Sequence, residues 1–277
     1  MTRIERLARG AHTPAALRWL ARLALRAGTH DLARAASAMA FDFFLGLVPL
    51  LAAMGYVISA LGNTRWVERL AKPLLEGAPG QAAAVAREQF FRYAHHGAIA
   101  PLGMVGFLWL ASGGAHTAVV TLRVIAGAPA RPWWRSRAIG VAFVLLAVAL
   151  ATVTTMALVL VARSSTLGVL RPHHALATGV VTALAGLGVI AVATATLYRL
   201  THGSHRSPVW PGTGVSVLGF VAVTWGFTLY IDTLGRFSAY YGGLAAVAML
   251  LGWIWLSSTC LLLGAEVNAL VGERDGG

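Results

Sequence analysis

Cysteine and acidic residues are scarce in this chain. Of its 277 residues, one is cysteine and ten are aspartate or glutamate. A single cysteine excludes a disulfide framework and a cysteine-based metal site. Charged residues make up 12 % of the chain, about half of the ~25 % that is usual in soluble domains. A soluble fold of this size would have too few polar side chains to cover its surface.

Six apolar runs occupy the places where charge is missing. Each has the ~20 residues that a helix needs to cross a hydrocarbon core about 30 Å thick. The first run is too long for the apolar core of a cleaved signal peptide. The sequence therefore predicts an all-α fold, a polytopic membrane bundle with six transmembrane helices. The runs are Ala38–Leu61, Pro101–Gly127, Ala138–Val161, Ala175–Leu197, Val209–Ile231 and Gly242–Leu270.

The formal net charge of +12 is distributed as in a membrane protein. Basic residues concentrate before the first run and in alternate loops. If the N-terminus is cytoplasmic, most of the 22 basic residues lie inside, as the positive-inside rule requires. We therefore expect both termini in the cytoplasm and no nucleic-acid partner.

The basic N-terminal segment, residues 1–36, contains an amphipathic pattern. Arg18, Arg22 and Arg26 recur every four residues and share one helical face. Such a pattern is typical of an interfacial helix whose arginines contact anionic lipid head groups. A solvated cytoplasmic helix is the alternative.

Residues 62–100 form a connection that is too long for a simple loop in a compact bundle. Their two amphipathic patches predict a short helical segment outside the cytoplasm, which acts either as a lid or as a passive cap. With the six-span bundle at 38–271, we expect a single integral membrane domain over 1–277.

Ionisable residues inside apolar runs are functional candidates, because a bilayer makes charge costly. Asp42, Arg123, Arg199 and Glu266 all fall in the cytoplasmic third of the predicted bundle. We expect them to form an intramembrane polar cluster. The alternatives are a structural ion-pair clasp, a substrate or proton-coupled site, and a set of unconnected groups.

Polar residues also share one helical face in two of the runs. Trp109, Ser112 and His116 lie on one face of the second run, and Trp255 and Thr259 on one face of the sixth. We expect these faces to line a pathway in the bundle. For His116, a proton relay and a hydrogen-bonded structural role both stay open.

Pro49 lies inside the first run. Proline removes a helical hydrogen bond, so it predicts a kink. Packing and a gating hinge are the two interpretations.

Enzyme motifs are missing. The sequence contains no P-loop, H-E-x-x-H or G-x-S-x-G pattern. The pairs His95-His96 and His173-His174 have no nearby carboxylate that completes a metal set. Two-metal phosphodiester hydrolysis needs clustered ligands, whereas the acids outside the runs are scattered. We expect no metal, no cofactor and no catalysis.

Motifs near both ends of the chain, including the Gly264-Ala265-Glu266-Val267-Asn268 segment, resemble the YihY/BrkB family, formerly labelled ribonuclease BN. The resemblance implies six spans in a bacterial inner membrane. Asp42 departs from the family pattern, so no family role is carried over to it. The segments that carry the resemblance are 36–41, 46–51, 208–212, 241–247 and 263–269.

The polar faces and the arginines favour a transporter or lipid-translocating protein for an anionic amphiphile. A non-transporting structural or regulatory membrane protein is the alternative, and a ribonuclease is a third reading with no visible chemistry. The expected partners are membrane lipids, with anionic head groups at the basic N-terminus.

Overall fold

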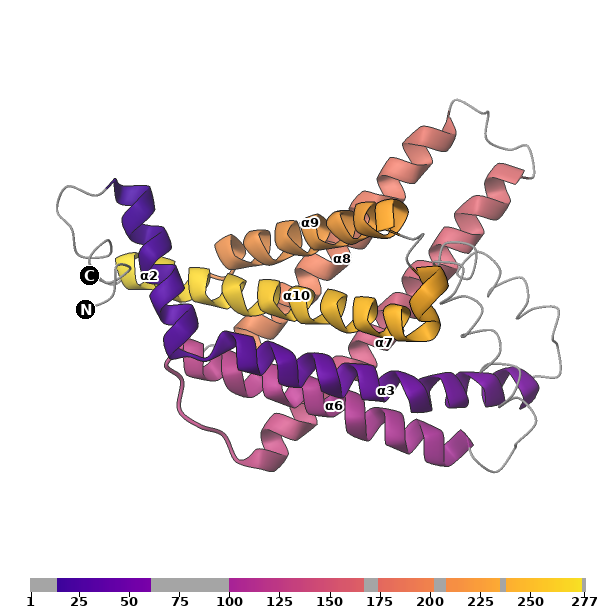
Figure 1. Cartoon of the computed structure of the whole chain (residues 1–277), viewed down its shortest axis with the longest axis horizontal. Helices are drawn as coiled ribbons and strands as arrows, with labels where there is room; N and C mark the ends of the chain where they lie inside the picture. Colours follow the sequence, from indigo (N-terminus) through magenta and orange to yellow (C-terminus); the bar gives the residue numbers. More distant parts are fainter. Residues whose placement is uncertain (1–13, 61–99, 167–173, 202–207, 235–237, 276–277) are drawn as a thin grey trace. The chain divides into compact units, whose positions relative to one another are not determined.

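The computed structural model describes residues 14–60, 100–166, 174–201, 208–234 and 238–275 (Figure 1). Within these ranges the chain forms seven α-helices and no strand, which confirms the all-α prediction for this part. The segment predicted to be helical at 62–100 lies outside the described residues except for Ala100, which begins α6. The helices are α2 (Ala15–Thr29), α3 (Leu32–Ala60), α6 (Ala100–Ile125), α7 (Trp133–Thr166), α8 (His174–Thr201), α9 (Trp210–Leu234) and α10 (Ser238–Asp275).

Four helices contain a stretch that is long and apolar enough to cross a membrane, among the residues described. These stretches match four of the six predicted runs. The remaining two runs, 38–61 and 138–161, lie on α3 and α7, which have 29 and 34 residues; their crossing stays a prediction. The four stretches are Val105–Ile125 in α6, Ala183–Thr201 in α8, Trp210–Tyr230 in α9 and Val247–Glu273 in α10.

The chain divides into two compact units according to which of its Cα atoms lie close together in space. The first unit comprises Met1–Leu32, Val119–Gly219 and Cys260–Gly277, and the second comprises Ala33–Ala118 and Phe220–Thr259. Helices α6, α9 and α10 each contribute several residues to both units, and α3 contributes only Leu32 to the first.

In the first unit, α9 and α10 approach each other backbone to backbone. A Cβ atom added to Gly212 would lie 1.9 Å from the carbonyl oxygen of Gly264. One added to Gly264 would lie 2.0 Å from Oγ of Ser216. Membrane helices associate largely through such close packing of small residues. Both glycines are therefore required by space, because no side chain fits between the two helices.

Tyr198 ties α8 to the same crossing. Its hydroxyl donates to the carbonyl oxygen of Leu261 in α10 at 2.6 Å. It is also hydrogen-bonded to Oγ of Ser216 in α9, again at 2.6 Å. The Tyr198 side chain is fully buried, so its one polar atom has partners from two neighbouring helices, as a buried hydroxyl requires.

The start of α9 is capped from another helix. The first N–H groups of a helix have no partner within it, and Pro211 has no N–H at all. The N–H of Gly212 donates to Oδ1 of Asn268 on α10 at 2.6 Å. A side chain of α10 therefore supplies the acceptor that the first turn of α9 lacks.

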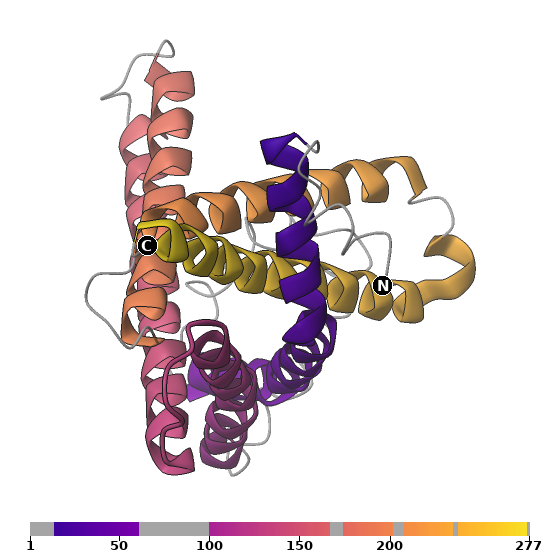
Figure 2. The same ribbon diagram turned by 90° about the vertical axis from the view of Figure 1, so that its left-hand side faces the viewer.

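The second unit contains a similar close approach between α3 and α6, which lie side by side in Figures 1 and 2. A Cβ atom on Gly46 would come within 3.3 Å of Cβ of Ala111. Pro49 lies inside the continuous helix α3, and its side chain lies 3.5 Å from the Cβ position of Gly106. Pro49 thus packs against a glycine of α6, while the predicted kink stays a prediction.

We expect Gly212→Ala to destabilise the protein by about 1–3 kcal/mol, because the added methyl group overlaps α10. Gly214→Ala is the matched control two residues further along α9. Its added Cβ would meet nothing within 4 Å, so the higher helix propensity of alanine should leave stability unchanged or slightly raised. Thermal unfolding in detergent measures both. Equal midpoints for the two variants would contradict the close helix crossing.

Candidate functional site

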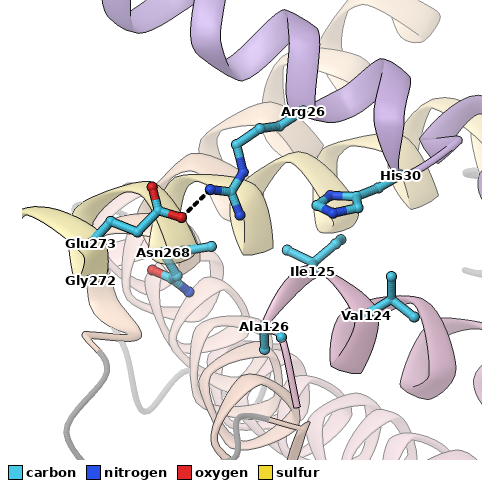
Figure 3. A pocket seen from close by; sticks show the side chains of 10 residues that line it. Arg26, His30, Val124, Ile125, Ala126, Asn268, Gly272 and Glu273 are labelled. Carbon is cyan, nitrogen blue, oxygen red and sulfur yellow. Dashed lines mark hydrogen bonds and ion pairs between the residues drawn. The ribbon is translucent and has the colours of Figure 1, made fainter. Parts of the chain in front are cut away.

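Helix α2 contacts the C-terminal part of α10 through charged side chains. Nε of Arg26 donates to Oε2 of Glu266 at 2.9 Å, and Nδ1 of His30 is hydrogen-bonded to Oε1 of the same carboxylate. Nη1 of Arg26 donates to Oε1 of Glu273, the contact drawn as a dashed line in Figure 3. Arg26 therefore bridges two carboxylates of α10.

The carboxylate of Glu266 is completely buried, whereas the side chains of Arg26 and His30 are 23 % and 22 % exposed. A buried charge is tolerated when it is paired and hydrogen-bonded, and here α2 supplies a partner for each carboxylate oxygen. Burial lowers the pKa of Arg26, but the contacts with Glu273 and Glu266 outweigh it, so its pKa lies above the ordinary value. The guanidinium is therefore charged at every physiological pH.

A cavity of about 360 Å³ lies where α2, the end of α6 and the end of α10 meet (Figure 3). The apolar wall consists of residues 124–127, which are the last turn of α6 and the two residues after it. Ala269 and Gly272 of α10 complete this wall. The polar wall consists of Arg26, His30, Asn268 and Glu273.

Gly127 ends α6 beside the cavity. Its φ angle is +61°, in the left-handed region that glycine adopts without strain. The next residue, Ala128, donates its N–H to the carbonyl oxygen of Arg123 at 2.9 Å. This turn fixes where the apolar wall stops.

Asn268 lines the cavity and also belongs to the crossing of α9 and α10. Its side chain is completely buried, and its Oδ1 accepts the N–H of Gly212. Its amide nitrogen Nδ2 has no hydrogen-bond acceptor among the residues described and lies 2.6 Å from the Cβ position of Gly212. The amide of Asn268 is therefore enclosed against α9.

Arg123 is also buried, at 6 % exposed, and its described contacts are with carbonyl groups. Nη1 donates to the carbonyl oxygen of Thr201 at 3.3 Å, and Nη2 donates to that of Pro129. Arg123 therefore connects the end of α6 to the end of α8 and to the loop that follows α6.

The four residues of the predicted polar cluster lie in different surroundings. Glu266 has Arg26 as its ion-pair partner and is also hydrogen-bonded to His30. Arg199 is exposed on α8. Asp42 belongs to the second unit, where its carboxylate lies opposite Gly113 of α6.

Sequence reasoning missed Arg26 and His30 as site residues. Arg26 was expected on a lipid-facing stripe with Arg18 and Arg22. The signal that could have found the pair is its spacing, because residues four apart lie on one helical face. Arg26 and His30 are two such residues next to a buried acid.

The residues expected to line a pathway lie in the second unit and differ in exposure. Ser112 is buried and donates to the carbonyl oxygen of Trp109 at 2.9 Å, whereas Trp109 itself is exposed and His116 is half-buried. Nε1 of Trp255 donates to Oγ of Ser37 at 3.1 Å. Thr259 bonds to the carbonyl oxygen of Trp255 in the preceding turn. Their role in a pathway stays a prediction.

No three histidine, cysteine or acidic side chains come together as a metal site within the described ranges. What the first unit offers instead is a charged and half-apolar cavity at the ends of two candidate spans. Long apolar helices joined through glycine crossings define the class: this is a helical membrane protein.

The chain belongs to the BrkB family. The family model described as virulence factor BrkB matches residues 23–277, which confirms the resemblance seen in the sequence.

Individual relatives match over shorter stretches. The ribonuclease-like protein YfkH of Bacillus subtilis is 35 % identical over 66 residues, 24 % of each chain. A UPF0761 membrane protein of Vibrio parahaemolyticus is 36 % identical over 77 residues, 28 % of this chain and 23 % of its own. A UPF0761 membrane protein of Xanthomonas campestris is 34 % identical over 86 residues, which are 30 % of this chain and 20 % of its own. The matches thus span about a quarter of these relatives. No solved structure matches the chain.

We expect Arg26→Gln to lower the free energy of unfolding by about 3–5 kcal/mol, because it strands the buried charge of Glu266. Glu266→Gln should cost less, since Arg26 is partly exposed and keeps Glu273. The double variant should recover part of the loss, with a coupling of about 0.5–3 kcal/mol.

Arg123→Gln combined with Glu266→Gln is the control for this double-mutant cycle. Because Arg123 bonds to carbonyl groups, these two losses should add within ~0.5 kcal/mol. Thermal unfolding in detergent measures every variant. Additive losses for Arg26 and Glu266 would contradict the ion pair.

Proposed function

We propose that this chain crosses the bacterial inner membrane six times, with both termini in the cytoplasm, and that it moves amphiphiles whose head groups carry an anionic phosphate. It does so without a catalytic step. The observation that carries the proposal is the cavity between α2, α6 and α10. It combines charged side chains with an apolar wall where two candidate spans end.

The contacts of α2 support this topology. Arg26 and His30 join the N-terminal helix to the end of α10. Segments in contact at the end of a spanning helix lie on the same side of the membrane. An even number of crossings between them follows, and six runs satisfy it.

Exposed aromatic and basic residues in the first unit support a head-group layer at the same level. Trp133, Trp134 and Trp210 are each 60 % exposed, at the starts of α7 and α9. Tryptophan is enriched at membrane–water interfaces. The guanidinium of Arg135 lies 5.0 Å from the ring centre of Trp134, and arginines at this depth attract anionic lipid.

The surface of α2 supports an interfacial position for this helix. Leu17 and Leu20 are 43 % and 53 % exposed, and Arg22 is exposed on the same helix. Exposed leucines on one side and an exposed arginine on the other are typical of helices that lie in the head-group plane. On this helix, Arg26 is then the arginine that contacts α10, while Arg22 faces the lipid.

We expect reporters fused after Gly277 and inserted within 202–207 to signal cytoplasm, because the positive-inside rule favours that side for both. A reporter within 167–173 is the control and should signal periplasm. A periplasmic C-terminus would contradict the topology.

We expect the purified protein, reconstituted in liposomes, to move fluorescent phospholipid between the leaflets. Dithionite added outside should then quench clearly more than the outer half of the label. Liposomes that contain the destabilised Gly212→Ala variant are the comparison for folding-dependent movement.

The dense glycine crossing of α9 and α10 favours a second candidate, a non-transporting structural or regulatory protein. Quenching that stops at the level of empty liposomes, with folded protein present, would favour that candidate.

A further inference from the structure

The cavity between α2, α6 and α10 is lined by charged groups of both signs, Arg26 and Glu273. We propose that it binds the zwitterionic head group of a phospholipid, with the phosphate on Arg26 and a primary ammonium on Glu273. This inference rests on the proposed function and names its substrate class.

The phosphate position is defined by the guanidinium of Arg26. Arg26 uses Nε for Glu266 and Nη1 for Glu273, and its Nη2 makes no hydrogen bond to a described residue. An oxyanion can accept from two N–H groups of one guanidinium, and hydrogen bonds to charged groups are the stronger ones.

The two carboxylates on Arg26 differ in how firmly they are held. Glu266 is completely buried and held by both Arg26 and His30. The side chain of Glu273 is 63 % exposed, and exposed ion pairs contribute little because water and salt screen them. An entering phosphate can therefore take the place of Glu273 on Nη1, while Glu266 continues to hold α2.

The displaced carboxylate is the reason for a zwitterion. A purely anionic head group would lie next to the freed Glu273 and be repelled by it. The last turn of α6, which forms the opposite wall, presents the negative end of a helix dipole and also favours a cation. An ammonium two carbons from the phosphate would pair with Glu273, so that every charge in the cavity keeps a partner.

The remaining wall fits a lipid. Val124, Ile125 and Ala126 are apolar, and the cavity of about 360 Å³ lies in the ~300–1,000 Å³ range of ligand pockets. It is located at the ends of the candidate spans Val105–Ile125 and Val247–Glu273. In a bilayer, the head groups begin where the apolar part of a spanning helix ends.

The test compares phosphatidylethanolamine, phosphatidylglycerol and soluble phosphoethanolamine on the purified full chain by native mass spectrometry. We expect the wild type to retain phosphatidylethanolamine about tenfold better than phosphatidylglycerol, the effect of one charge-assisted contact. Glu273→Gln should abolish this preference by weakening phosphatidylethanolamine binding. Glu273 is exposed, so the variant should fold, which its unfolding midpoint checks.

Asp31→Asn is the matched control. It removes the same charge from the first unit at a residue that does not line the cavity. Its φ angle is +53°, a conformation that asparagine also tolerates. The control should keep the wild-type lipid preference, and its loss there would overturn the assignment to Glu273.

Equal binding of the two lipids, or a Glu273→Gln variant that keeps the preference, would overturn the inference. Soluble phosphoethanolamine that binds as tightly as the lipid would overturn the lipid as its source. Liposome quenching separates the two proposals. Lipid movement without the binding preference leaves the proposed function standing, and the binding preference without movement leaves only the present inference.

Discussion

The buried carboxylate of Glu266 is the constraint on which the first unit depends. A charge removed from water must be paired, because its desolvation is otherwise uncompensated. Helix α2 supplies that pairing through Arg26 and His30. Since these two side chains also form the polar wall of the cavity, the interaction that holds α2 in place is the one that builds the site. Docking of α2 and formation of the cavity are therefore one event.

The segment around Glu266 contacts two neighbouring helices at once. Gly264 and Asn268 are four residues apart, so they share one face of α10, and both contact Gly212 of α9. Glu266 lies between them in sequence and on the other face, where it meets α2. Because the two faces of α10 alternate along this segment, a small residue, an acid and an amide follow one another here two residues apart. A change of register by one residue would break all three contacts.

The sequence was sufficient to predict the helices and to select Glu266, since apolar runs and an acid within them depend on local composition. It could not identify the partner of Glu266. Arg123 and Arg26 were both available, and the choice depends on where α2 docks, which is a property of the tertiary packing. Arg26 also shares its spacing with Arg18 and Arg22, so the pattern favoured lipid for all three. The cavity could not be predicted either, because its walls come from three segments that are far apart in the chain.

The proposed function implies two kinds of electrostatic selection at different distances in the first unit. The exposed arginines, such as Arg22, Arg135 and Arg199, would act in a head-group layer over about 8–10 Å, the screening length at physiological salt. At that range they would attract any phosphate-bearing amphiphile. In the cavity itself, Arg26 faces two carboxylates, those of Glu266 and Glu273. On this proposal, attraction from a distance would not discriminate among lipids, so the discrimination would come from the contacts that replace Glu273 on Arg26.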